Sequence, residues 1–239
     1  KIDRILDGNN WNDKQLSPLQ ALGVDVQEGD YILAINGQSV KNLPNLHQAL
    51  VGKAGEKIEM QVNNEPAMEG SHSEIIKPLG DESELYYFNW VQNNIQTVHD
   101  KTDGQVGYIH IPDMISHGLN EFVEHFYPQL GKKALIIDDR GNGGGNVSPM
   151  IIERLRREVT RAKIRRNADE PSYTPSEAMR GPLVLLMDKY SASDGDLFAY
   201  SFKKNNLGPV IGTRSWGGVV GIRGSLPFID GGSLRINQF

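Results

Sequence analysis

Two loops in this sequence carry the residue types that acyl-transfer chemistry requires. Residues 139–146 have the sequence Asp-Arg-Gly-Asn-Gly-Gly-Gly-Asn, and residues 189–196 have the sequence Lys-Tyr-Ser-Ala-Ser-Asp-Gly-Asp. Ser193 offers a hydroxyl nucleophile. Successive glycines adopt backbone conformations that other residues avoid, so a substrate backbone can approach their amides closely. The amides of Gly145 and Asp194 could together hold the negatively charged oxygen of a tetrahedral intermediate.

Each loop has a plainer interpretation. Ser193 before Asp-Gly-Asp is also an ordinary helix N-cap. The three glycines could cradle a phosphate, but they lack the Gly-Lys-Ser/Thr ending of a P-loop. The carboxylates of this region could suggest a metal, yet no calcium-loop pattern fits them and no histidine pair accompanies them. These carboxylates are Asp138, Asp139, Asp194 and Asp196.

Alternating strands and helices are expected to position both loops. Near-continuous apolar strands separated by helices predict an α/β domain with a mainly parallel sheet. Ligand sites in such sheets usually lie at the carboxyl ends of the strands, which is where both loops fall. The helix after the glycine loop is expected to have Ser148 as N-cap and Pro149 in its first turn. The predicted strands are 106–111, 134–138, 182–187 and 210–213, and the predicted helices are 118–130, 149–163 and 194–206.

The first 80 residues predict a separate, β-rich domain. A turn leads into an apolar strand and an Asn-Gly turn at 31–37, and leucines at helical spacing follow in 42–53. Residues 57–62 alternate as a half-buried strand, and 63–73 are a polar loop. The order resembles a PDZ domain of the bacterial protease type, and such domains bind extended peptides at a sheet edge. The expected division is 1–80 PDZ-like, 81–105 connecting helix (with 85–98 helical) and 106–239 catalytic.

The amino-acid composition excludes several classes of protein. The net charge of −5 and the absence of basic tails argue against a nucleic-acid binder. Without cysteine there is no disulfide scaffold, cysteine nucleophile or thiolate metal site. No apolar run approaches the length of a membrane span, so no membrane partner is expected. The chain opens at Lys1 rather than Met and stops at Phe239 in mid-pattern, so we expect a piece of a longer protein.

Several motifs, in order and spacing, resemble tricorn protease and its homologues. These are residues 108–114 with 118–122, 140–145, 193–196, 201–204 and 211–222. The resemblance implies a ClpP/crotonase-type α/β subdomain after the PDZ-like domain, and hydrolysis of peptides or unfolded segments with no cofactor or metal. It implies Ser193 as nucleophile and the amides of Gly145 and Asp194 as oxyanion hole. The substrate-binding residues that it implies are Gly143, Gly144, Trp216, Gly217 and Gly218.

The base that must take the proton from Ser193 is not evident. C-terminal-processing relatives use a lysine in a Gly-Lys-Gly turn, but glycine occupies that place in 216–219. The tricorn branch implies a histidine before the PDZ-like region and a later glutamate, which would lie upstream of Lys1 and downstream of Phe239. We therefore expect the isolated chain to be inactive or nearly so. The histidines that are not expected to serve are His47, His72, His99, His110, His117 and His125.

The expectations for substrate specificity and for assembly rest on the resemblance to tricorn protease. In tricorn an acidic residue after the triple-glycine helix favours basic side chains, but residues 161–166 here are Arg-Ala-Lys-Ile-Arg-Arg. A basic lining would favour acidic or apolar side chains by charge complementarity, unless these charges form the solvated face of a helix. A cytoplasmic hexamer is implied, with the periplasm as the alternative location. The rival functions are a non-catalytic peptide-binding module on a degenerate peptidase core and a crotonase-type acyl-CoA enzyme.

Overall fold

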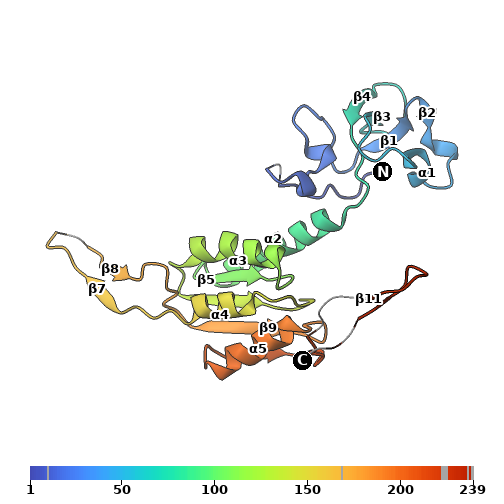
Figure 1. Ribbon diagram of the computed structural model, residues 1–239. Helices are drawn as coiled ribbons and strands as arrows, with labels where there is room; N and C mark the ends of the chain where they lie inside the picture. Colours follow the sequence, from blue (N-terminus) through green and yellow to red (C-terminus); the bar gives the residue numbers. More distant parts are fainter. Residues whose placement is uncertain (10, 168, 222–225, 236, 238–239) are drawn as a thin grey trace. The chain divides into compact units, whose positions relative to one another are not determined.

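The chain divides into two compact units, residues 1–93 and 94–239. The computed structural model describes residues 1–9, 11–167, 169–221, 226–235 and 237 (Figure 1). Helix α2 (Ser83–Lys101) contains the boundary between the units. The helix predicted over 85–98 is therefore confirmed and is slightly longer at both ends.

The first unit is built on a four-stranded antiparallel sheet in the order β2-β1-β3-β4. Asn36 and Gly37 have φ values of 47° and 77° and form the two-residue turn between β1 and β2, a conformation that Asn-Gly favours. Ile58, Met60 and Val62 alternate into the core of this unit, which confirms the half-buried strand predicted over 57–62. The strands are β1 (Tyr31–Ile35), β2 (Gln38–Ser39), β3 (Ile58–Asn63) and β4 (His72–Ile76).

Two expectations for this unit need correction. The helix predicted over 42–53 is reduced to α1 (His47–Leu50), preceded by a 3-10 turn over Val40–Asn42. Pro44 explains the break, because proline lacks an amide donor and disfavours helical backbone at the residue before it. The loop predicted over 63–73 is confirmed for residues 64–71, but its ends belong to strands: Asn63 closes β3, and His72 begins the edge strand β4. Sequence analysis did not predict β4, whose mostly exposed side chains show no apolar alternation.

The second unit is built on a four-stranded parallel sheet in the order β10-β9-β6-β5. Its core combines apolar strand residues with four buried phenylalanines from two of the helices, Phe122, Phe126, Phe198 and Phe202. The four predicted strands are confirmed, as are the helices that begin near 118 and at 194. The strands are β5 (Val106–His110), β6 (Ala134–Asp138), β9 (Leu183–Met187) and β10 (Val210–Gly212), and the helices are α3 (Ser116–Phe126), α4 (Ser148–Leu155) and α5 (Asp194–Lys204).

The helix predicted over 149–163 is wrong beyond Leu155, where α4 ends. Residues Arg161–Lys163 instead form β7, which pairs antiparallel with β8 (Ser172–Thr174). The β-branched Val159 and Thr160 before β7 favour extended backbone. The charges of 161–166 are therefore not the solvated face of a helix. The N-cap of α4 is Val147, and Ser148 is its first helical residue.

A second short hairpin, β11 (Leu226–Pro227) with β12 (Ser233–Leu234), follows the parallel sheet. No helix in the described part of the chain is long and apolar enough to cross a membrane.

Candidate active site

The glycine loop and the serine loop lie together at one end of the parallel sheet. They follow β6 and β9, which are neighbouring parallel strands, so both strands deliver their loops to the same edge. The Ala192 amide donates to the Asn142 carbonyl at 2.8 Å. A Cβ at position 144 would lie 2.6 Å from the Ser193 Cβ. The sequence-predicted loops are therefore in direct contact.

Ser193 has a strained backbone. Its φ of 54° and ψ of −113° lie outside the regions that non-glycine residues normally occupy. Ser193 stands at the N-cap position of α5, yet its side chain makes no capping hydrogen bond. Within the described part of the chain, nothing accepts from or donates to its hydroxyl, and the residue is partly exposed. The N-cap interpretation therefore does not explain this serine.

Two backbone amides beside Ser193 donate no hydrogen bond within the described part of the chain. Gly145 has a φ of 152° and passes so close to Met114 that a Cβ would lie 1.9 Å from the Met114 carbonyl oxygen. The amides of Gly145 and Asp194 donate to no acceptor in residues 1–9, 11–167, 169–221, 226–235 and 237. Gly145 is exposed. Neither amide is therefore engaged within the described part of the chain, although Asp194 itself is buried.

Asn142 holds the glycine loop in shape, and sequence reasoning did not single it out. Its side-chain amide donates to the Ile111 carbonyl at 3.0 Å, and its Oδ1 accepts from the Gly144 amide at 2.9 Å. Asn142 is fully buried. A polar residue between flexible glycines is the only sequence signal that could have pointed to it.

The carboxylate of Asp194 ties the two loops together a second time. Its Oδ1 accepts from the Ser148 hydroxyl at 2.6 Å, and its Oδ2 accepts from the Ser148 amide at 2.9 Å. Both residues are buried. Sequence analysis assigned Ser148 to capping its own helix, so this pairing is new.

The Trp216–Gly218 segment lies along the serine loop. The Trp216 amide donates to the Ser191 carbonyl at 3.0 Å, and the Gly217 amide donates to Asp196 Oδ1 at 2.8 Å. The Trp216 side chain is 66% exposed. A Cβ at Gly218 would collide with the Trp216 ring, so a side chain there would require this exposed ring to move. Residue 222, which ends the predicted motif 211–222, lies outside the described residues.

Two neighbouring carboxyls behind the loops have opposite surroundings. Asp138 accepts from the Tyr108 hydroxyl at 2.7 Å and from Arg140 Nε at 2.8 Å. Burial and then the Asp138 carboxylate raise the pKa of Tyr108, and the hydrogen bond to Asp138 raises the pKa of Arg140. Asp139 is completely buried, and its carboxyl oxygens have no partner in the described part of the chain. Burial raises the pKa of Asp139 well above its usual range. The described residues contain no cluster of three or more histidine and acidic side chains suited to a metal ion.

The histidines of the second unit have other partners than Ser193. His110 Nε2 lies 2.9 Å from the Arg140 carbonyl, and burial lowers the pKa of His110. The remaining three lie beside acidic side chains: His99 beside Asp100, His117 beside Asp113 and Glu121, and His125 beside Glu121. His47 and His72 belong to the first unit.

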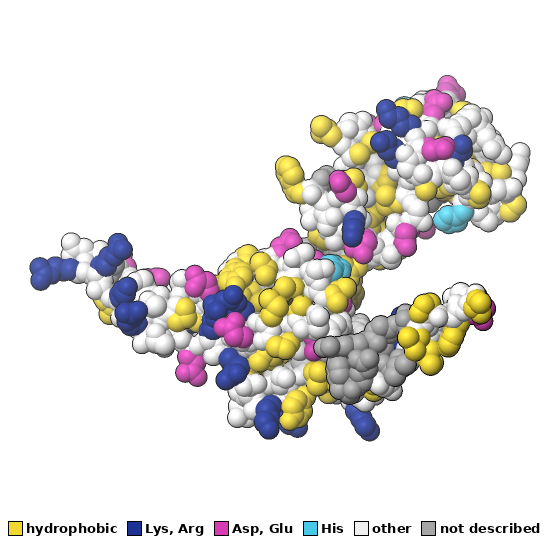
Figure 2. Space-filling model, viewed as in Figure 1, with side chains coloured by type: hydrophobic (Ala, Val, Ile, Leu, Met, Phe, Trp, Pro, Cys, Tyr) yellow, Lys and Arg dark blue, Asp and Glu magenta, His cyan; other side chains and the backbone are white. Residues whose placement is uncertain are grey.

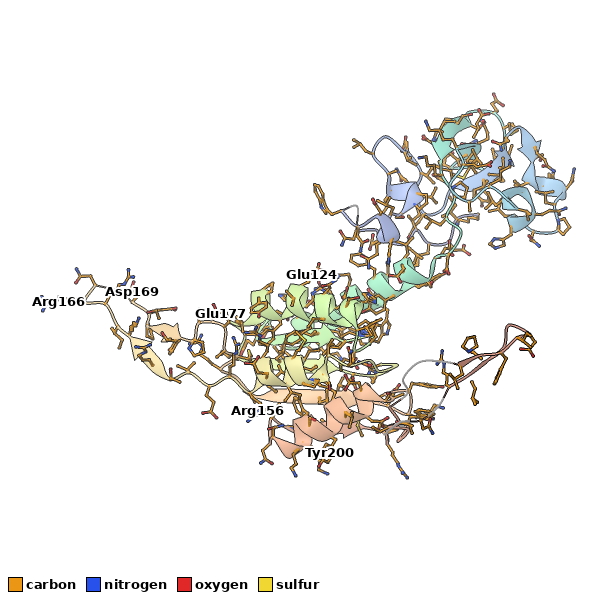
Figure 3. The ribbon with its side chains drawn as sticks, in the orientation of Figure 1. Glu124, Arg156, Arg166, Asp169, Glu177 and Tyr200 are labelled. Atoms are coloured by element: carbon orange, nitrogen blue, oxygen red, sulfur yellow. The ribbon has the colours of Figure 1, made fainter. Side chains whose placement is uncertain are left out.

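The basic stretch 161–166 does not line the site around Ser193 of the same chain. The β7–β8 hairpin lies between the end of α4 and the start of β9, whereas Ser193 follows the other end of β9. The hairpin therefore projects from the opposite end of the sheet. Its lysines and arginines gather along it (Figure 2), and Arg166 and Asp169 lie at its tip (Figure 3).

Comparisons with known proteins agree with this architecture. Residues 105–239 match the model of peptidase family S41, and residues 1–81 match the tricorn protease PDZ domain. The crystal structure of the tricorn protease superposes with a TM-score of 0.87 at 36% identity, covering 98% of this chain and 22% of that one.

Curated relatives carry the same name. Tricorn protease of Thermoplasma volcanium is 38% identical over 239 residues, which are 100% of this chain and 23% of that protein. A putative tricorn-like protease C-terminal subunit of Sulfurisphaera tokodaii is 40% identical over 223 residues, 93% of this chain and 25% of that protein. This chain spans about a quarter of the length of these relatives.

The match over residues 105–239, on a parallel α/β unit that follows a PDZ-like β domain, places this chain in peptidase family S41. Within that family, the chain belongs to the tricorn protease family, as its motifs predicted.

Proposed function

We propose that this chain is the peptide-binding and nucleophile-bearing part of a tricorn-type serine peptidase. Residues 1–80 are its PDZ-like domain, 81–105 its connection and 106–239 its catalytic subdomain. The observation that carries the proposal is Ser193, whose strained backbone presents an uncommitted hydroxyl at the start of α5, directly against Gly144. Strain of this kind is retained where the surroundings hold it in place, and it concentrates at functional sites.

In the proposed reaction, Ser193 Oγ attacks the carbonyl carbon of a peptide bond while a base removes its proton. The electron pair of the carbonyl moves onto oxygen, which accepts hydrogen bonds from the amides of Gly145 and Asp194. Collapse of this intermediate expels the amine, which takes up the proton, and leaves Ser193 acylated. Water then attacks the ester in the same way, releases the acid and restores the hydroxyl.

The substrate in this proposal is an extended peptide. On one side, Gly143 is exposed and leaves room for a close main chain, while the lack of a side chain at the buried Gly144 lets the loop pack against Ser193. Trp216 on the other side offers a largely exposed indole, and Gly217 and Gly218 follow it. The anchoring of this segment to Ser191 and Asp196 supports its place beside the nucleophile.

We further propose that the base comes from outside residues 1–239, so that this chain alone turns over peptide very slowly at most. Support comes from the unbonded Ser193 hydroxyl and from the other partners of the second unit's histidines. A hexameric assembly and a cytoplasmic location belong to the same proposal through the tricorn resemblance. Sedimentation velocity of the chain would test the assembly.

The test is covalent labelling of the chain with a peptidyl fluorophosphonate, with imidazole added as an external base. We expect slow labelling without imidazole, acceleration with rising imidazole concentration, and a single modified residue, Ser193, identified by mass spectrometry. Ser193→Ala should abolish labelling, while Ser176→Ala, an exposed serine away from both loops, should not. A chain that binds peptide but never labels at Ser193 would instead be a non-catalytic binding module.

A further inference from the structure

The buried contact between Ser148 and Asp194 joins the two segments that carry the proposed oxyanion-hole amides. Ser148 lies three residues after Gly145, and Asp194 directly follows Ser193. The Asp194 carboxylate accepts hydrogen bonds from both the hydroxyl and the amide of Ser148, at 2.6 Å and 2.9 Å. Hydrogen bonds to a carboxylate are shorter and stronger than neutral ones, and burial shields these two from water.

Backbone hydrogen bonds restrain the chain between Gly145 and Ser148, so a displacement of Ser148 is passed on to Gly145. The Asn146 and Val147 amides both donate to the Met114 carbonyl, at 2.7 Å and 3.1 Å. The Met114 amide in turn donates to the Gly144 carbonyl at 2.9 Å. A shift of Asp194 relative to Ser148 therefore changes the separation of the amides of Gly145 and Asp194.

The contact also controls where the negative charge of Asp194 lies. The carboxylate is held at the first turn of α4, where the helix dipole and the Ser148 amide compensate its charge. An Asp194 side chain released from this position would be free to approach the anionic oxygen that its own amide is meant to bind.

We propose that Ser148 is a positioning residue for the oxyanion hole: through the Asp194 carboxylate, it sets the spacing and the electrostatics of the amides of Gly145 and Asp194. The inference rests on the proposed function. Stabilisation by oxyanion-hole donors depends on geometry, and a displacement of about 1 Å costs up to roughly 100-fold in rate.

The experiment compares wild type with Ser148→Ala, Ser148→Thr and Met150→Ala in saturation kinetics of imidazole-supported fluorophosphonate labelling. Ser148→Ala removes the hydroxyl but keeps the amide, so the maximal labelling rate should fall roughly 10- to 100-fold while the half-saturating reagent concentration is unchanged. Ser148→Thr restores the hydroxyl and should restore the rate. Met150→Ala, at an exposed position of the same helix, should label like wild type.

Thermal unfolding of each variant separates positioning from a loss of fold. If Ser148→Ala is unfolded, Ser148→Cys takes its place, because a thiol has a similar size and is a weaker donor than a hydroxyl. The chain has no other cysteine, and this variant should label at an intermediate rate. Wild-type labelling rates in a folded Ser148→Ala, or no restoration by threonine, would overturn the inference and leave the proposed function standing. Absence of Ser193-dependent labelling in wild type would overturn both.

Discussion

Ser193 holds a backbone conformation that costs on the order of 1–3 kcal/mol, and its neighbours maintain it. The Gly195 amide donates to the Ala192 carbonyl, and the Leu197 amide donates to the Ser193 carbonyl. These bonds fix the chain on either side of the strained residue. The hydroxyl is thereby aimed by backbone contacts, so no side chain has to hold it in place.

Asp139 gives a prediction at the same scale. Its raised pKa means that the folded chain holds the Asp139 proton more tightly than the unfolded chain. The free energy of unfolding therefore contains a contribution that is complete at low pH and is lost as pH rises from the usual value of 3.8 towards the raised pKa. Its slope is at most about 1.4 kcal/mol per pH unit.

Asp139→Asn keeps the shape and removes the proton equilibrium, so the variant should become more stable relative to wild type as pH rises. Urea unfolding between about pH 4 and pH 9 measures the difference. Asp169→Asn, an exposed aspartate, is the control and should show no such trend. A constant difference between Asp139→Asn and wild type across this range would show that Asp139 titrates normally.

At the scale of elements, the parallel pairing of β6 with β9 is what brings the two loops together. The helices after these loops, α4 and α5, also lie side by side, so the two loop–helix junctions meet at Ser148 and Asp194. The β7–β8 hairpin belongs to the other end of this arrangement.

Replacing residues 161–173 with a short glycine–serine linker should leave labelling of Ser193 unchanged. The Thr160 amide donates to the Thr174 carbonyl at 2.9 Å, so the ends of the excised segment are close and a short linker can span them. Labelling rates of the monomeric chain measure the effect. A reduced rate under those conditions would mean that the hairpin supports the site from within one chain, and Arg165→Gln with Arg166→Gln would then separate charge from structure.

At the scale of the whole molecule, each of the two units has a hydrophobic core of its own. The β sheet of the first unit packs around Ile58, Met60 and Val62, while the strands and phenylalanines of the second unit form their own cluster. Every residue proposed for the chemistry lies in the second unit.

Met60→Ala should therefore destabilise the first unit by roughly 2–5 kcal/mol, because it leaves a cavity at a residue that is 2% exposed. Met68→Ala, at 62% exposure, is the matched control and should be neutral. Hydrogen exchange locates the effect within residues 1–93, and Ser193 labelling should persist. Loss of labelling in Met60→Ala would show that the chemistry depends on the first core.

The sequence by itself determined the α/β class, the parallel strands and the loops, because these follow from local patterns. It pointed to Ser193 as the candidate nucleophile through the resemblance of its motifs. Apolar runs, glycine positions and motif spacing are properties of short segments. The sequence-based predictions failed where a local pattern was ambiguous. The helical pattern continues past Leu155 into residues that form β7 in the structure, and the exposed edge strand β4 has no alternation of polar and apolar residues.

Only the tertiary structure decided which distant residues meet. Asn142 with Ile111, and Ser148 with Asp194, are pairs far apart in sequence that a common sheet edge brings within hydrogen-bonding distance. The tertiary structure also shows that the basic stretch 161–166 lies away from Ser193 of its own chain. The physical reason is that a local pattern reports how a segment buries its own surface, whereas contacts between loops depend on strand order and direction.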